Sequence, residues 1–370
     1  MKPLYRGLAS ATRRKASRFA LETRLDAMTT RLKDVGEFGL IERIRRLLPG
    51  APDVDVIVGI GDDVAVLETG GGSYLLATCD CQVEGVHFLW DTTTPFELGR
   101  KAAAVNLSDI AAMGGAPRWA LVSLMAPQEI LVESIEELYR GLGGALAEAG
   151  AVVVGGNTAK SSEGLIVDIT LLGRVAPEHL LTRSGARPGD VAAVTGTLGD
   201  ARAGLELWLR PESGVPEEEA RTVKRRYTSP QARLLEGQCL GRCGAVHAML
   251  DVSDGLLSDL RHMCEASGVG VELEVERVPV SPALPAVAAA LKADALAWAL
   301  TGGEDYELLF AVSEKDFPRV ADQLLQETGT TCRAIGRFVD RDQGLRLILE
   351  DGRRSSFDAY AGGWDHFKAT

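Results

Sequence analysis

Carboxylates recur on glycine-bearing turns that directly follow apolar segments. These acids are Asp62 and Asp63 after Gly61, Asp80 after the apolar run 75–79, Asp251 and Asp254 around Val252-Ser253, and Glu304 and Asp305 after Gly302-Gly303. Asp109 instead lies inside an otherwise apolar helical segment, where an unpaired charge would be expensive. Like charges that gather repel one another unless cations lie among them, and hard oxygen ligands of this kind suit Mg²⁺ shared with phosphates.

Each acid also has an ordinary structural explanation. Ser253 or Asp254 could cap the helix that follows, and Asp62-Asp63 could be only a turn. Asp109 could pair with Lys101 or Arg100 on its own helix. The joint pattern nevertheless favours a cation site, because several separate element ends carry the same charge.

Familiar catalytic signatures are missing from the sequence. There is no Walker loop GxxxxGK[ST], no kinase catalytic-loop signature and no convincing Ser-His-Asp or Cys-His arrangement. The sequence therefore favours metal-assisted transfer without a covalent nucleophile. His87 stands alone among these motifs, and a lone histidine is more often structural than catalytic.

Composition excludes several classes of protein. The chain has 370 residues, of which 46% are hydrophobic and 25% charged, as expected for two ordinary domains. Residues 34–370 carry a net charge of about −19, which argues against a nucleic-acid-binding surface. No window approaches 18 consecutive apolar residues, so we expect no membrane span and a cytoplasmic protein.

The first 33 residues differ from the rest, with nine Lys or Arg and two Asp or Glu. This stretch could be a transit peptide, but we favour a disordered or weakly helical N-terminal extension. The six cysteines form no CxxC pair or zinc-like pattern, which indicates reduced and mostly buried thiols.

Apolar periodicity predicts alternating helices and strands. Helices are expected over 36–48, 96–113, 134–149, 200–209, 230–241 and 254–266, and strands over 54–58, 64–67, 74–79, 119–125, 152–154, 165–175, 191–195, 246–252 and 270–275. Residues 211–220 are expected to be a solvated connector. Hairpin-like strand pairs mixed with helices favour an α+β fold, which we divide into domains over 34–178 and 179–370.

Taken together, these segments resemble the thiamine-monophosphate kinase family of the aminoimidazole-ribonucleotide-synthetase-like superfamily. The resemblance rests on GEFGLIERI (36–44), VGIGDDVAVL (58–67), TCDCQVEGVHF (78–88), KAAAVNLSDIAAMGGAP (101–117), VVGGNT (153–158), LTRSGARPGD (181–190), DVSDGLLSDL (251–260), TGGEDYELLF (301–310) and GWDHF (363–367). These segments span about nine-tenths of the chain in family order.

The resemblance implies a two-domain fold with mixed or antiparallel sheets flanked by helices. It implies that ATP and thiamine monophosphate give thiamine diphosphate and ADP in a cleft between domains that holds several Mg²⁺ ions. It also implies a homodimer formed through the N-terminal domains. The matching positions give metal roles to Asp63, Thr78, Cys79 (through its backbone), Asp80, Asp109, Asn157, Asp251 and Asp254. They give ATP contacts to Gly156, Asn157, Arg183 and Ser253, and acceptor contacts to His87 and Glu304.

Two departures from the family pattern stand out. Asn157 occupies a position where many relatives have an aspartate, so one metal ligand would be a neutral amide oxygen. Ala361 stands where an aromatic residue is common, so Tyr360 or Trp364 is expected to cover the acceptor instead.

Other members of the superfamily fit the sequence less well. Selenophosphate synthetase would need a reactive residue near its N-terminus, but the first cysteine here is Cys79. The hydrogenase-maturation relative needs a C-terminal cysteine, and aminoimidazole ribonucleotide synthetase should carry a different signature from DVSDGLLSD. A non-catalytic nucleotide-binding or metal-binding module is the alternative from another class.

Overall fold

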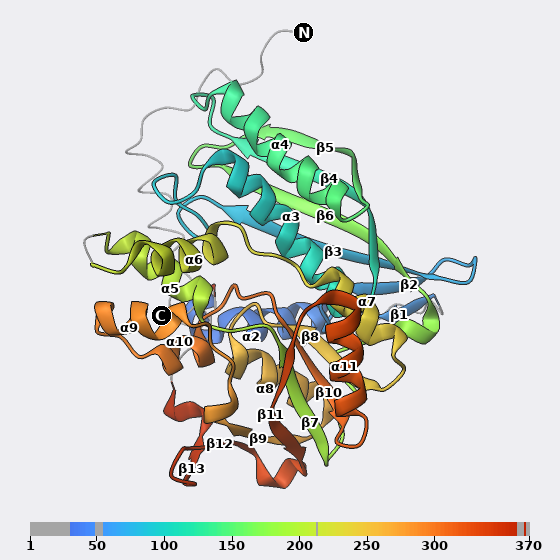
Figure 1. Cartoon of the computed structure of the whole chain (residues 1–370). Coiled ribbons are helices and arrows are strands. Elements are labelled where there is room, and N and C mark those ends of the chain that lie inside the picture. Colours follow the sequence, from blue (N-terminus) through green and yellow to red (C-terminus); the bar gives the residue numbers. More distant parts are fainter. Residues whose placement is uncertain (1–29, 49–54, 212–213, 361–365, 368–370) are drawn as a thin grey trace. The chain divides into compact units, whose positions relative to one another are not determined.

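The computed structural model describes residues 30–48, 55–211, 214–360 and 366–367 (Figure 1). The chain divides into two compact units, one of residues 1–50 and 365–370 and the other of residues 51–364. The smaller unit holds helix α2 (Leu32–Leu47), which is kinked at Gly36 where φ is 70°. Most of the expected N-terminal extension and the position of Trp364 lie outside the described residues.

The first sheet of the larger unit has six strands in the order β1-β2-β3-β6-β4-β5. Their bounds are β1 (Val56–Val58), β2 (Ala65–Glu68), β3 (Tyr74–Val83), β4 (Ala116–Ala126), β5 (Val152–Lys160) and β6 (Ile166–Val175). Neighbours pair antiparallel except β4 and β5, which pair parallel. The sheet is therefore mixed.

Helices α3 (Pro95–Ala112) and α4 (Val132–Glu148) pack together on one face of this sheet (Figure 1). α3 begins at a capping box, in which the Thr94 side chain accepts from the Glu97 backbone N–H and Glu97 reaches back to Thr94. A Cβ on Gly99 would overlap the Leu138 carbonyl oxygen, so the two helix backbones touch directly. This close approach buries α3 along most of its length.

The second sheet has seven strands in the order β13-β12-β9-β11-β7-β10-β8. Its strands are β7 (Asp190–Thr195), β8 (Val246–Asp251), β9 (Gly270–Glu274), β10 (Leu308–Ser313), β11 (Cys332–Val339), β12 (Leu345–Ile348) and β13 (Arg354–Ser356). The accompanying helices are α5 (Asp200–Leu209), α6 (Glu217–Thr228), α7 (Leu234–Arg242), α8 (Leu256–Ser267), α9 (Ala283–Leu291), α10 (Ala295–Thr301) and α11 (Phe317–Thr328). Two mixed sheets flanked by helices confirm the α+β prediction.

The end of α3 packs into the core between α7 and the second sheet. Ala111 and Ala112 at the end of α3 pack in one apolar cluster with Leu240 of α7 and Phe310 of β10. A Cβ on Gly237 would overlap the Ala111 carbonyl oxygen, so α7 crosses α3 at backbone distance. This crossing places the C-terminal end of α3 beside the end of β8.

Several expectations from the sequence are wrong. β5 does not stop at Val154 but continues to Lys160, and β3 continues past Cys79 to Val83. The expected connector 211–220 contains the start of α6 at Glu217. Cys79 and Cys81 are exposed, whereas Cys239 and Cys264 are buried as expected.

Among the described residues, no single helix is long and apolar enough to cross a membrane. α9 and α10 reach that length and composition only when taken together, and they are bent by 114° at their break.

Candidate active site

Four aspartates from four separate segments come together at the end of α3. Asp63 lies on the turn before β2, Asp80 in β3, Asp109 in α3 and Asp251 at the end of β8. Burial raises the pKa of Asp109 well above its ordinary value, and the charges of Asp80, Asp251 and Asp63 raise it further. Burial and then the Asp63 charge raise the pKa of Asp251 to about 8. The four carboxyls therefore repel one another at close range.

Neighbouring polar groups fix these carboxyls in place. The Thr78 hydroxyl donates to Asp109, while Lys101 pairs with Glu304 and Arg100 with Glu148, so the alternative that Asp109 pairs with Lys101 or Arg100 is wrong. The Ser108 hydroxyl donates to Asp251 Oδ2 at 2.5 Å, which ties α3 to the end of β8. Because Ser108 and Asp109 are adjacent on α3, one helix end is bonded both to Asp251 of the second sheet and to Thr78 of the first.

Arg183 reaches this acid group from the loop before β7. Its guanidinium pairs with Asp63, and its backbone N–H donates to both carboxylate oxygens of Asp62 at 3.3 Å. Ser267 Oγ accepts from the backbone N–H groups of Gly185 and Ala186 at 3.1 Å, which anchors the same loop to α8. Burial and the Asp63 charge raise the pKa of Asp62 to about 6. The turn at 62–63 is therefore more than a connection between strands.

The turn after β8 carries Ser253 and Asp254. The N-cap of α8 is Gly255 and not Ser253 or Asp254, so the capping alternative is wrong. Instead Asp259 Oδ2 accepts from the backbone N–H groups of residues 253, 254 and 255 at 3.1, 3.2 and 3.1 Å. Asp259 thus shapes the turn that carries Asp254, and burial followed by the charges of Asp254 and Asp251 raises the pKa of Asp259 well above its ordinary value.

His87 and Glu304 meet around Lys101. Lys101 Nζ lies 2.6 Å from Glu304 Oε1 and donates to the His87 carbonyl oxygen at 3.2 Å. His87 Nδ1 accepts from the Val83 backbone N–H at 3.0 Å, which sets the orientation of its ring. The structure therefore brings together the two residues expected to face the acceptor.

Other expected residues lie apart from the acid group. The strand register puts Asn157 opposite Ser123, Asp168 and Cys81, on the sheet face away from the Asp80 side chain. Cys79 points to that same face, where its thiol lies 3.3 Å from Asp168 Oδ1. The backbone at Gly156 lies very close to β4, because a Cβ there would overlap the Val122 carbonyl oxygen.

Of the two C-terminal aromatic residues expected to cover the acceptor, the structure describes only Tyr360. Tyr360 follows the short 3-10 helix Phe357–Ala359 and packs against the core of the second sheet. No hydrogen bond among the described residues links Tyr360 to His87 or Glu304. Trp364 lies outside the described residues.

Sequence reasoning missed Ser108, Asn106 and Asp259 as residues that support the site. Asn106 Oδ1 accepts from the Asp80 backbone N–H at 3.2 Å, and the Asn106 side chain is 1% exposed. A polar residue inside an otherwise apolar helical segment could have pointed to Asn106, Ser108 and Asp259, as it did to Asp109. A buried polar side chain in a helix needs a partner, and here the partners are the acid-bearing segments.

The chemistry of the acid group fits Mg²⁺. Asp63 Oδ2 is buried without a hydrogen-bond partner, and a hard cation would satisfy such an oxygen. Within the described ranges, no three His, Cys, Asp or Glu side chains are placed to hold a metal ion by themselves. Mg²⁺ commonly takes only one or two protein carboxylates and completes its shell with phosphate oxygens and water.

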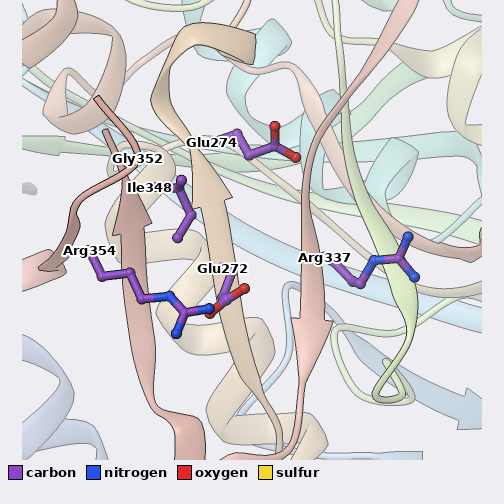
Figure 2. Close-up of a pocket in the computed structure, with 6 residues that line it drawn as sticks. All are labelled: Glu272, Glu274, Arg337, Ile348, Gly352 and Arg354. Atoms are coloured by element: carbon purple, nitrogen blue, oxygen red, sulfur yellow. The ribbon is translucent and has the colours of Figure 1, made fainter. Parts of the chain in front are cut away.

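An open hollow of about 680 Å³ lies elsewhere, on the outer face of the second sheet (Figure 2). It is lined by Glu272, Glu274, Arg337, Ile348, Gly352 and Arg354. Arg354 pairs with Glu272 at 2.9 Å, and Arg337 pairs with Glu314 at 2.6 Å. It contains none of the predicted site residues, and we assign it no ligand.

Family models match the chain in two consecutive parts. The model for the AIR synthase related protein, N-terminal domain, matches residues 61–175, and the model for its C-terminal domain matches residues 187–348. Thiamine-monophosphate kinase of Aquifex aeolicus (strain VF5) is 38% identical over 310 residues, which are 84% of this chain and 96% of that protein. The chain belongs to the thiamine-monophosphate kinase family. The resemblance drawn from its motifs is thereby confirmed.

Further comparisons agree with this membership. Thiamine-monophosphate kinase of Salmonella typhimurium is 37% identical, over 90% of this chain and 98% of that protein. A solved structure of AaThiL complexed with AMPPCP and TMP has a TM-score of 0.79 and 35% identity, and the match covers 92% of this chain and 100% of the other.

Proposed function

We propose that this protein transfers the γ-phosphoryl group of ATP to thiamine monophosphate, giving thiamine diphosphate and ADP. The observation that carries the proposal is the convergence of Asp63, Asp80, Asp109 and Asp251 from four segments. A buried group of like charges is costly for a fold unless it serves a cationic ligand. The family relationship supports the choice of the two phosphorylated substrates.

A phosphate oxygen of thiamine monophosphate would attack the γ-phosphorus of ATP in line. Both reactants are anionic, and bound Mg²⁺ would supply positive charge between the carboxylates and the phosphate oxygens. The remaining work of the protein is to bind and orient the reactants. A phosphate monoester is already largely deprotonated near pH 7, so the reaction needs no strong general base.

We assign the predicted roles to these positions. The metal ligands would be Asp63, Thr78, the Cys79 backbone, Asp80, Asp109, Asp251 and Asp254. Asn157 would hold a further ion, because its side chain faces away from that of Asp80. ATP would contact Gly156, Asn157, Arg183 and Ser253, and the acceptor would contact His87 and Glu304 and be covered by Tyr360 or Trp364. Arg183 has the strongest geometric support among the ATP contacts, because its guanidinium already lies beside Asp63.

We also propose that the working form is a cytoplasmic homodimer joined through the first sheet. The face of this sheet away from α3 exposes apolar side chains, including Leu121 at 42% and Val152 at 56%. Exposed apolar side chains gathered on one face commonly mark an interface. Sedimentation of the purified chain tests the dimer, and a monomer at micromolar concentration would contradict it.

The decisive experiment mixes the purified protein with ATP, Mg²⁺ and thiamine monophosphate. Mass detection of thiamine diphosphate together with ADP release would support the proposal. ATP binding without product would instead favour the non-catalytic nucleotide-binding module.

Substitution of the acids gives the first specific prediction. Asp80→Asn and Asp251→Asn should each lower kcat by roughly 100-fold or more, because each removes a negative charge that would hold the cation. Asp316→Asn, a matched change at an exposed aspartate before α11, should leave kcat unchanged. Circular dichroism would check folding, and near-normal turnover in both site variants would contradict the assignment.

A further inference from the structure

Lys101 is a fully buried ammonium between the two residues expected to bind the acceptor. It extends from α3, and its side chain is 0% exposed. Its Nζ lies 2.6 Å from Glu304 Oε1, 3.2 Å from the His87 carbonyl oxygen and 4.1 Å from the centroid of the Tyr227 ring. Three segments distant in the sequence therefore meet on one charged atom.

A purely structural role explains this arrangement poorly. A buried ion pair is often no more stabilising than apolar side chains of the same volume. The two members of the pair also differ in exposure, because the Glu304 side chain is 28% exposed while the Lys101 side chain is fully buried. One carboxylate oxygen binds the ammonium, and part of the Glu304 side chain still reaches solvent.

The backbone around Glu304 is strained and held firmly. Glu304 and Tyr306 have φ values of 66° and 51°, in the left-handed region that non-glycine residues rarely adopt. The backbone N–H groups of Glu304 and Tyr306 donate to the carbonyl oxygens of Ser253 and Val252 at 2.7 and 2.8 Å. With the main chain fixed against the Asp251–Asp254 turn, the direction of the carboxylate depends on its side-chain torsions.

We propose that Lys101 is a positioning residue for the acceptor substrate, which aims the Glu304 carboxylate and holds the His87 loop beside it. This inference rests on the proposed function. With Oε1 bound to Lys101, Oε2 is left to accept from an N–H donor or to face a cationic ring. The fitting acceptor is a phosphate monoester that carries a positively charged or amino-substituted heteroaromatic ring. Thiamine monophosphate has both kinds of group.

Steady-state kinetics of Lys101→Met tests the proposal. Loss of a charge-assisted contact should raise KM for thiamine monophosphate roughly 10- to 100-fold. KM for ATP should stay within about twofold, because Lys101 contacts the acceptor residues and not the Arg183 loop. Lys224→Met is the matched control, since Lys224 Nζ also lies over an aromatic ring, that of Trp208 at 4.2 Å, but on α6. It should change neither KM.

If Lys101→Met does not fold, Glu304→Gln provides the test. Because Glu304 is partly exposed, this substitution should leave the fold intact. It should raise KM for the acceptor selectively, and in its background Lys101→Met should add little further. An unchanged acceptor KM in Glu304→Gln, equal rises in both KM values, or additive effects in the double variant would each overturn the inference. If the wild-type protein had no activity on thiamine monophosphate, the proposed function itself would be contradicted.

Discussion

Asp109 and Asp251 keep their carboxyls in surroundings that disfavour negative charge. Burial and neighbouring acids raise the pKa of both, while single hydroxyl groups from Thr78 and Ser108 oppose this rise. The sequence identified the acids themselves, because their type and their place on turns are visible in it. It gave Thr78 a metal role but could not show that Thr78 and Ser108 donate to these acids, because a hydroxyl side chain acquires such a partner only from what the fold places opposite it.

His262 on α8 gives a prediction about pH. Burial, with the nearby charges of Arg183 and Arg261, lowers the pKa of His262 from 6.5 to about 4. In the unfolded chain the imidazole binds a proton below about pH 6.5, whereas in the folded chain it stays neutral until about pH 4. The free energy of unfolding should therefore fall by up to about 3 kcal/mol as pH drops through this window.

Urea unfolding of wild type and His262→Phe at pH 7.5 and pH 4.5 measures this effect. The variant should lose less stability than wild type on acidification, since it lacks the titrating group. Other ionisable groups titrate in both proteins, so the difference between the two proteins isolates His262. Parallel losses would contradict the prediction.

α3 is the element that organises the site. Its side chains contact Glu304 through Lys101, the Asp80 backbone through Asn106, and Asp251 through Ser108. Periodicity predicted this helix almost to the residue, at 96–113 against the observed Pro95–Ala112. It could not predict which face meets which neighbour, because the helix is buried on nearly every side and has no polar face to orient it.

β5 and α6 show where local patterns fail. β5 is expected from the sequence to end at Val154 but runs on through Gly155-Gly156-Asn157, because parallel pairing with β4 supplies the hydrogen bonds that hold this segment extended. α6 begins in an acidic stretch that predicted a connector, yet it buries Val223 and Tyr227 against its neighbours. In both cases tertiary contacts override the local preference.

Two glycines in the α3–α4 pair provide a matched test of close packing. Gly99→Ala should destabilise the protein by about 1–3 kcal/mol, because the new Cβ would overlap the Leu138 carbonyl oxygen. Gly143→Ala in α4 meets nothing within 4 Å and should stabilise by about 0.5–1 kcal/mol through helix propensity. Urea denaturation measures both, and similar effects from the two changes would contradict the packing argument.

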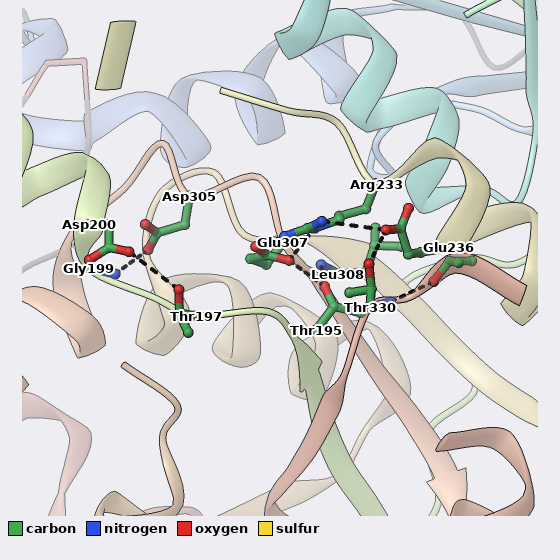
Figure 3. A network of polar contacts seen from close by, with 11 residues as sticks. Thr195, Thr197, Gly199, Asp200, Arg233, Glu236, Asp305, Glu307, Leu308 and Thr330 are labelled. Atoms are coloured by element: carbon green, nitrogen blue, oxygen red, sulfur yellow. Dashed lines mark hydrogen bonds and ion pairs between the residues drawn. The ribbon is translucent and has the colours of Figure 1, made fainter. Parts of the chain in front are cut away.

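At the scale of the larger unit, a polar network around Arg233 and Glu307 links the second sheet to the start of α7 (Figure 3). α7 in turn packs on α3. Arg233 donates through Nε and Nη2 to the two carboxylate oxygens of Glu307 at 2.6 and 2.5 Å. Glu307 is 1% exposed and also accepts from Thr195 Oγ1 at 2.7 Å. The same network continues through Glu236 to Thr330, two residues before β11.

Removing one partner of the Arg233–Glu307 pair should lower the free energy of unfolding. Arg233→Met should cost about 3–5 kcal/mol, because it leaves the Glu307 charge buried without its partner. Adding Glu307→Gln should recover part of that loss, since the amide is neutral and still accepts from Thr195. Arg242→Met, which removes the exposed pair with Glu327, should cost at most about 1 kcal/mol.

Thermal or urea unfolding of these variants distinguishes the outcomes. A double variant that is less stable than Arg233→Met alone would contradict the view that the unpaired charge causes the loss.

The burial of α3 also bears on how this chain tolerates change. Thirteen of its eighteen residues are buried, three of them as Lys101, Asn106 and Ser108 with polar partners on other segments. In a library of random single substitutions, a helix that is buried on nearly every side has few positions where a new side chain leaves stability unchanged. Surviving clones should therefore be scarcest within residues 98–112, and the neighbouring helix α4 should accept far more variety.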